Sequence, residues 1–331
     1  TLMRRILLED TLKKTGIMMI DGSMSTALEE LGCQLNDSLW TAKILAGEPE
    51  KIRTVHYNYF AAGADCGITA SYLASIPGFC QRGYTVQEAE NLIRRSVQLF
   101  CEARTQWWEQ EGKSQDRAYP MCLGAVGPYG AYLADGSEYR GNYGVSRQEL
   151  LDFHQRRMEL LWQEGADLLL METQPSLNEA LLEAELAENM HADYWISFTC
   201  KDESHTCEGD EIQQCAKVLS TAHPHLKMIG INCTDPALIE GLVENLRLAT
   251  DLPIAVYPNS GDVYDPKEKV WKKRPGGVNL TGMALRWMQQ GVSAVGGCCT
   301  TVSSHIRDIT ALRNDYVAGK VKAEKISVTA R

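Results

Sequence analysis

The chain has 331 residues, of which 44% are hydrophobic and 23% are charged. This composition is typical of a globular protein with a large core, and the length suits one α/β barrel. The net charge of −10 argues against nucleic acid and against an anionic membrane as partners. We find no apolar run of transmembrane length and no secretory signal, so we expect a cytoplasmic protein.

Eight short apolar runs recur along the chain, and each ends in small or polar residues. Continuous apolar runs of this length are typical of parallel strands that are buried on both faces. In chain order they cover residues 17–22, 66–72, 121–128, 167–173, 194–200, 228–233, 253–259 and 294–299.

Segments with helix start and stop signals separate these runs. Asp235 followed by Pro236 predicts a helix start. Gly63 and Gly165, in "GADC" and "GADL", predict helix ends directly before a strand. Three sequences predict a capping box in front of an amphipathic helix. They are "TVQE" (85–88), "SRQE" (146–149) and "SLNE" (176–179).

Strands that alternate with helices in this way predict a single (β/α)8 barrel domain over residues 1–331. The alternative is an open doubly wound sheet. "DGSMS" (21–25), after the first strand, lacks the glycine-rich phosphate turn that such a sheet usually carries. The first three strand spacings are long, so we expect extra structure in the loops after these strands. Such loops build the active sites of barrel enzymes.

Polar side chains gather where the predicted strands end. Because the carboxyl ends of barrel strands meet at one rim, we expect these side chains to lie close together. Each has a structural explanation when taken alone, but the joint pattern indicates a site. The residues are Asp21, Thr69, Ser71, Tyr72, Glu172, Asn232, Cys233, Asn259, Cys298 and Cys299.

Three of these rim residues form a candidate metal site. Cys233 ends the sixth predicted strand, and Cys298 and Cys299 end the eighth. Three thiolates suit zinc, which keeps a fourth position open in catalytic sites. Gly296 and Gly297 would let the backbone bend so that adjacent cysteines reach one metal. Spacing alone leaves open a vicinal disulfide or two buried thiols. Most of the other cysteines lie singly in apolar or helical runs, where we expect buried, reduced thiols.

Motifs along the chain together resemble the homocysteine S-methyltransferase family, in register from about residue 15 to 315. They are "DG" at 21, "TASY" at 69, "GPYGAYLADGSEYRG" at 127, "GINC" at 230, "YPNSG" at 257 and "GGCC" at 296. The chain is most similar to the branch that uses S-methylmethionine or S-adenosylmethionine as methyl donor. The resemblance implies a (β/α)8 barrel with zinc held by three cysteines, here Cys233, Cys298 and Cys299.

The resemblance also implies that homocysteine binds at the rim. Asp21 and Glu172 match family positions near its amino group. In betaine-using relatives a tyrosine follows the glutamate and can fill the open zinc position. Here Thr173 stands in that place, so the fourth ligand of a resting zinc stays open. The substrate-binding residues implied are Asp21, Gly22, Ser71, Glu172, Asn232 and Gly297.

The implied reaction is transfer of a methyl group from a sulfonium donor to homocysteine, which gives methionine. Zinc would deprotonate the homocysteine thiol, and three cysteine thiolates would keep the bound sulfur electron-rich. We expect no protein nucleophile, because the task is to align the two sulfurs. Aromatic faces suit a sulfonium cation. The candidates for the donor site are Trp40, Tyr72, Tyr129 and Tyr132.

Other functions stay open at this stage. Thr173 and the "GSEYRG" loop (136–141) argue against a betaine-type enzyme. No folate or cobalamin region follows the barrel, which favours a stand-alone enzyme over a fragment of a cobalamin-dependent methionine synthase. A selenocysteine-type acceptor and a non-catalytic zinc- or thiol-binding barrel also stay open. The sequence does not indicate an oligomeric state.

Overall fold

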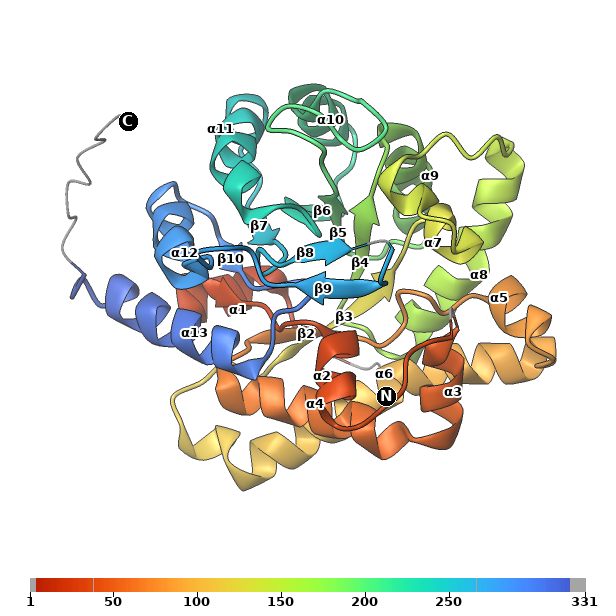
Figure 1. Ribbon diagram of the computed structural model, residues 1–331, viewed down its shortest axis with the longest axis horizontal. Helices are drawn as coiled ribbons and strands as arrows, with labels where there is room; N and C mark the ends of the chain where they lie inside the picture. The colour runs from red at the N-terminus through yellow and green to blue at the C-terminus, as the bar shows by residue number, and fades with distance from the viewer. Residues whose placement is uncertain (1–3, 38, 266, 322–331) are drawn as a thin grey trace.

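The computed structural model describes residues 4–37, 39–265 and 267–321. Eight parallel strands form one sheet in the order β1-β10-β7-β6-β5-β4-β3-β2, and helices surround it (Figure 1). This arrangement confirms the predicted (β/α)8 barrel. The barrel strands are β1 (Met18–Met19), β2 (Cys66–Ile68), β3 (Met121–Val126), β4 (Leu168–Gln174), β5 (Tyr194–Phe198), β6 (Leu226–Asn232), β7 (Ile254–Tyr257) and β10 (Ala294–Val295).

The helices follow the predicted pattern, with extra elements after β1, β2 and β3. The α-helices are α1 (Leu8–Thr15), α2 (Met24–Glu30), α3 (Trp40–Gly47), α4 (Pro49–Ala62), α5 (Ile76–Gln81), α6 (Val86–Gln110), α7 (Tyr129–Leu133), α8 (Arg147–Glu164), α9 (Leu177–Asn189), α10 (Ile212–Leu219), α11 (Ile239–Ala249), α12 (Leu280–Gln289) and α13 (Ser303–Val317). Short 3₁₀ helices are η1 (Gly112–Ser114), η2 (Ser137–Tyr139) and η3 (Pro236–Leu238). No helix among the described residues is long and apolar enough to cross a membrane.

Alternate residues of each strand pack into two separate cores. In β3, Met121 and Leu123 face the inside of the barrel, whereas Cys122 faces the surrounding helices. Leu8 of α1 packs with the inner core, and the Ile6 N–H donates to Asp167, just before β4. The segment around α1 therefore covers the barrel end opposite the rim.

Two of the three predicted capping boxes form completely. Thr85 and Ser146 each begin a helix with both reciprocal hydrogen bonds. Ser176 accepts from the Glu179 N–H, but the Glu179 carboxylate lies in the interior, 2.8 Å from His154 Nε2. The capping-box prediction at 176–179 is therefore wrong in its second half, because buried partners take this carboxylate.

The predicted helix boundaries at glycine and proline are confirmed. Gly63 and Gly165 end α4 and α8 with positive φ angles of 126° and 116°. Asp235 caps η3, where its carboxylate accepts from the Ala237 N–H at 2.9 Å, and η3 continues into α11.

A small antiparallel hairpin follows β7 and was not predicted. It consists of β8 (Val263–Asp265) and β9 (Val270–Lys272), and Figure 1 shows it in front of the barrel strands. Tyr264 and Trp271 are both exposed on it. Strands of three residues without a buried face produce no alternating pattern, so sequence periodicity cannot reveal them.

Most of the strands are shorter than the apolar runs that predicted them, and β2 and β10 are the two that matter most for the site. β2 ends at Ile68 and β10 at Val295, whereas the runs continue to residues 72 and 299. The remaining residues of both runs form the rim, where the chemistry-bearing side chains lie.

Candidate metal and substrate site

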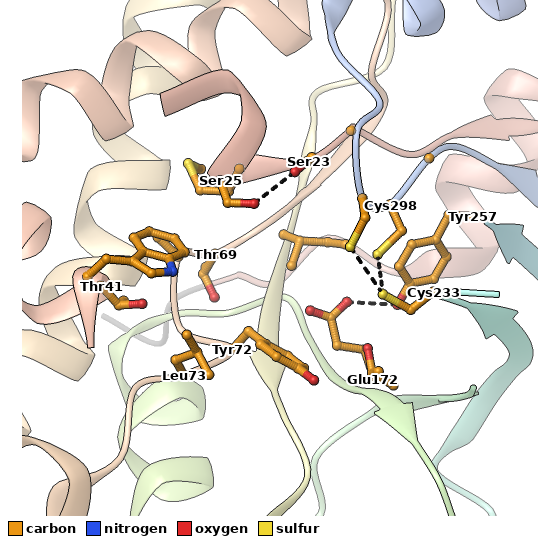
Figure 2. Close-up of a pocket in the computed structure, with 18 of the residues that line it drawn as sticks. Ser23, Ser25, Thr41, Thr69, Tyr72, Leu73, Glu172, Cys233, Tyr257 and Cys298 are labelled. Atoms are coloured by element: carbon orange, nitrogen blue, oxygen red, sulfur yellow. Dashed lines mark hydrogen bonds between the residues drawn. The ribbon is translucent and has the colours of Figure 1, made fainter. Parts of the chain in front are cut away.

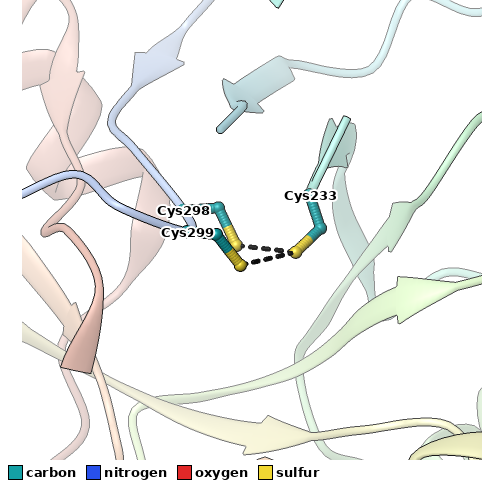
Figure 3. A group of neighbouring side chains, drawn as sticks. All are labelled: Cys233, Cys298 and Cys299. Atoms are coloured by element: carbon teal, nitrogen blue, oxygen red, sulfur yellow. Dashed lines mark hydrogen bonds between the residues drawn. The ribbon is translucent and has the colours of Figure 1, made fainter. Parts of the chain in front are cut away.

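The three candidate metal-ligating cysteines lie together at the rim. Cys233 follows β6, and Cys298 and Cys299 follow β10, so that the adjacent pair faces Cys233 (Figure 3). Cys233 Sγ lies 3.0 Å from Cys298 Sγ and 3.6 Å from Cys299 Sγ. The fold thus brings three thiols from two separate strands to one point.

The spacing of these sulfurs suits a single zinc ion. Sulfurs bound tetrahedrally at about 2.3 Å from zinc are about 3.8 Å apart. The distance between Cys233 and Cys299 is close to this value. The Cys298 sulfur would move by less than about 1 Å, which rotation of one side chain can supply.

The three thiols together favour one negative charge. Cys298 and Cys299 donate to the Cys233 sulfur and hold the pKa of Cys233 well below its ordinary value. The same contacts with Cys233 raise the pKa values of Cys298 and Cys299 well above the ordinary value. A metal cation bound here would replace the two remaining protons, as thiolate coordination requires.

The backbone around the cysteines adopts conformations that L-residues rarely take. Thr173, Cys233 and Thr300 have φ angles of +57°, +49° and +62°. A left-handed conformation costs roughly 1–2 kcal/mol, and such residues often cluster at functional sites. At Thr173 the strain coincides with a bulge in β4. Asn232 also holds this residue, because its Oδ1 accepts from the Thr173 N–H at 2.9 Å.

Gly296 and Gly297 serve close packing below the cysteine pair. A Cβ on Gly296 would lie 2.6 Å from Ile20 Cβ, and one on Gly297 would lie 2.4 Å from the Thr301 side chain. Neither glycine has a positive φ; that conformation falls on Thr300 instead. The two glycines therefore do not provide the expected sharp bend. They allow close approach to the segment directly after β1 and to the turn that follows the cysteines.

A cavity of about 240 Å³ opens beside the cysteines. Figure 2 shows Glu172 next to Cys233, with Tyr72 on the other side of Glu172. Among the predicted substrate and donor residues, those in the cavity lining are Gly22, Trp40, Tyr72, Glu172 and Gly297.

Glu172 is the carboxylate of this cavity. Its Oε2 accepts a hydrogen bond from the Tyr257 hydroxyl at 2.8 Å. Burial raises the pKa of Glu172 to about 8, and the Cys233 charge adds to this effect. An ammonium group that entered the cavity would favour the ionised carboxylate.

Three predicted substrate residues lie behind the cavity and form hydrogen bonds with the strand ends that surround it. Asp21 Oδ2 accepts from the Ile68 N–H at 2.9 Å and so joins the ends of β1 and β2. Ser71 donates to the Ala125 carbonyl at 2.8 Å. Asn232 holds the end of β4. All three are buried, and burial raises the pKa of Asp21 well above its ordinary value.

Tyr129 and Tyr132 pack outside the cavity. Their rings contact Phe153 of α8, with ring centroids 5.0 and 5.3 Å apart. The structure therefore does not bring these two donor-site candidates to the cysteines, because α7 turns them toward α8 instead.

Tyr139 and Tyr257 are cavity residues that the sequence analysis missed. Tyr139 Oη lies 3.7 Å from Cys233 Sγ, and the charge of Cys233 raises the pKa of Tyr139. The long 127–141 motif contained the signal, but its individual residues were not placed. Tyr257 alternates with Ala255, which also faces the barrel interior, so strand periodicity could have found it.

Comparison with known proteins gives the family. The family described as homocysteine S-methyltransferase matches residues 18–312. The chain belongs to this family. Homocysteine S-methyltransferase YbgG of Bacillus subtilis (strain 168) is 46% identical over 296 residues, which are 89% of this chain and 94% of the relative.

Two further similar proteins extend the comparison. Selenocysteine Se-methyltransferase of Brassica oleracea var. italica is 43% identical over 314 residues, with 91% of this chain and 90% of the relative covered. The metallated form of the homocysteine methyltransferase MmuM from Escherichia coli superposes with a TM-score of 0.84 at 39% identity. That match covers 92% of this chain and 99% of the solved chain.

Proposed function

We propose that this chain transfers a methyl group from S-methylmethionine to homocysteine and so produces methionine. The observation that carries the proposal is the cluster of Cys233, Cys298 and Cys299 beside a cavity that also contains Glu172. Homocysteine brings a thiol and an ammonium group, which suit these two features. The barrel is then a single homocysteine-binding domain.

Three cysteine thiolates suit zinc better than a hard cation such as Mg²⁺. Cys233, Cys298 and Cys299 would hold the zinc, and the metal would supply the charge that keeps the homocysteine thiol ionised at neutral pH. Glu172 would pair with the ammonium group of the acceptor. Gly22 and Gly297 also line the cavity, and we expect the acceptor carboxylate to lie at their backbone.

The proposed reaction needs no nucleophile from the protein. The homocysteine sulfur attacks the methyl carbon, a new carbon–sulfur bond forms, and the old one breaks. The electron pair of the broken bond stays on the donor sulfur, which leaves as a neutral thioether. The residues of this chain supply alignment of the two sulfurs, which can account for several kcal/mol of the barrel enzyme's rate enhancement.

The donor side of the cavity has aromatic walls. Trp40 and Tyr72 line it, and aromatic faces attract a poorly hydrated cation such as a sulfonium. The volume of about 240 Å³ lies below the range usual for drug-sized ligands. This small volume favours S-methylmethionine over the larger S-adenosylmethionine.

Selenocysteine is a second candidate acceptor. The observation that favours it is the 43% identity to a selenocysteine Se-methyltransferase. A selenol would use the same cysteine cluster, because selenium and sulfur differ little in size. In either case the cluster requires reduced thiols, which supports a reducing compartment such as the cytoplasm.

The test combines metal analysis with product formation. We expect about one zinc per chain, methionine formation from homocysteine, and faster transfer from S-methylmethionine than from S-adenosylmethionine. Cys298→Ala should lose most of the zinc and nearly all transfer. The matched control is Cys122→Ala, which changes a buried thiol of β3 and should lower stability only. Full zinc retention by Cys298→Ala would overturn the assignment.

A further inference from the structure

A group of buried charged side chains lies behind the cavity, on α8 and α9. Arg157, Glu179 and Glu183 are at most 2% exposed, and His154 is fully buried beside them. None of these residues lines the cavity. Charges that are buried together reduce stability unless they are well paired, so this arrangement calls for a reason beyond packing.

Arg157 binds the backbone where two rim loops begin. Its guanidinium donates to the carbonyl oxygens of Gly127 and Tyr72, both at 3.0 Å, and to that of Ser71 at 3.4 Å. Gly127 follows β3, and Ser71 and Tyr72 follow β2. One side chain therefore ties the carboxyl ends of two neighbouring strands together from behind.

Tyr72 is held from a second side by Gly127. A Cβ on Gly127 would lie 2.4 Å from the Tyr72 carbonyl oxygen and 2.8 Å from its ring. The Tyr72 ring points into the cavity in Figure 2. Contact with Gly127 and the hydrogen bond from Arg157 thus leave little freedom for the backbone that presents this ring.

Glu179 forms hydrogen bonds with the segment that follows β3 and contains Tyr139. Its carboxylate accepts from the Tyr129 N–H at 2.8 Å and from the Tyr143 hydroxyl at 2.9 Å. Tyr129 and Tyr143 lie on either side of Tyr139 in the sequence, and the Tyr139 hydroxyl lies next to Cys233. The buried group therefore reaches both loops that carry the cavity tyrosines.

The charges of Arg157 and Glu179 support each other. Burial lowers the pKa of Arg157 to about 10, which leaves the guanidinium cationic at neutral pH. The nearby Glu179 carboxylate supplies negative charge that favours this cation. Both carboxylate oxygens of Glu183 lack hydrogen-bond partners within the described part of the chain, and burial, together with the nearby Glu179, raises the pKa of Glu183 well above its ordinary value.

We propose that Arg157, with Glu179 as counter-charge, positions the loops of Tyr72 and Tyr139 against the cysteine cluster and thereby sets the binding of the methyl donor. The inference rests on the proposed function, because it concerns the donor side of the same cavity. Arg157 is then a positioning residue that touches neither substrate.

The test compares Arg157→Met with Arg104→Met. Arg104 makes a partly buried ion pair with Asp167, 2.9 Å away, at the opposite end of the barrel. For Arg157→Met we expect kcat/KM for S-methylmethionine to fall about ten- to a hundredfold. Its zinc content and its homocysteine Kd, measured by calorimetry, should change less than about twofold. Arg104→Met should lose stability in urea while its donor KM stays that of the native protein.

Tyr143→Phe is a milder second variant, because it removes only one hydrogen bond to Glu179. We expect a smaller rise in donor KM and an unchanged homocysteine Kd. The inference fails if Arg157→Met weakens both substrates equally or behaves as Arg104→Met does. It also fails if the protein carries two metal ions and Glu183→Gln loses one, because His154, Glu179 and Glu183 would then be ligands. A native protein without transfer would instead refute the proposed function.

Discussion

At the scale of single residues, Glu172 determines how the acceptor is recognised in our account. Glu172→Gln keeps the shape and removes the charge that would pair with the homocysteine ammonium. Loss of such a contact commonly amounts to a few kcal/mol. We predict a ten- to hundredfold rise in the homocysteine KM, about 1.4–2.7 kcal/mol, with zinc content unchanged. Initial rates over a range of homocysteine concentrations measure this effect.

A thiol acceptor without the amino group is the control for Glu172. It should be a poor substrate for the native protein and no worse for the Glu172→Gln variant. If the variant loses activity equally with homocysteine and with this analogue, Glu172 merely supports the rim. The hydrogen bond from Tyr257 would be the structural reason in that case.

At the scale of elements, Asn232 joins the carboxyl ends of three strands. Its side chain bonds the Thr173 N–H at 2.9 Å, the Thr173 hydroxyl at 2.8 Å and the Ser197 hydroxyl at 2.8 Å. Asn232→Ala leaves these buried groups unpaired, and each such group costs about 1–3 kcal/mol. We predict that the free energy of unfolding in urea falls by at least about 3 kcal/mol.

Asn232→Ala should also raise the homocysteine KM, because Thr173 directly follows Glu172. Asn245→Ala is the matched control, since Asn245 is a partly exposed residue of α11 whose side chain bonds Gln213 and the Glu203 carbonyl. Its unfolding free energy should change by less than about 0.5 kcal/mol. Equal losses of stability in the two variants would contradict a special role for Asn232.

Sequence patterns predicted those helices and strands whose formation depends on neighbouring residues in the chain. The apolar runs predicted the eight barrel strands, and Thr85 and Ser146 predicted helix starts, because each depends on neighbours in the sequence. The capping-box prediction at Glu179 failed because the partners of this carboxylate, His154 and the segment near Tyr143, come from elsewhere in the chain.

The candidate site was predictable to the extent that it lies at strand ends. Cys233, Cys298 and Glu172 follow buried runs, so barrel geometry places them on one rim. Tyr139 comes from a loop that folds back over the cysteines, and no periodicity describes such a loop. Arg157 lies in the middle of a helix, and only the tertiary structure shows that it binds the rim backbone.

At the scale of the whole molecule, buried His56 makes stability depend on pH. It packs against Phe60 and Phe100, and neither ring nitrogen has a hydrogen-bond partner within the described residues. Burial lowers the pKa of His56 to about 3 from an ordinary value of 6.5. Below pH 6.5 the unfolded chain therefore binds a proton that the folded protein does not, and stability falls.

The predicted contribution of His56 is about 1.4 kcal/mol lost per pH unit between pH 6 and pH 4. Urea unfolding at several pH values measures it, and His56→Leu provides the comparison. In the variant, the plot of unfolding free energy against pH should become less steep by this amount. The absolute free energy of unfolding is not the quantity compared. Parallel slopes for the two proteins would show that His56 is not held neutral.

The central claim is that three cysteine thiolates hold zinc and leave a position for the acceptor sulfur. Zinc X-ray absorption of the purified protein, recorded with and without homocysteine, tests it most directly. We predict three sulfur ligands at about 2.3 Å in the free protein and four after homocysteine is added. A coordination shell that contains fewer than three sulfurs, or one that homocysteine leaves unchanged, would contradict the account.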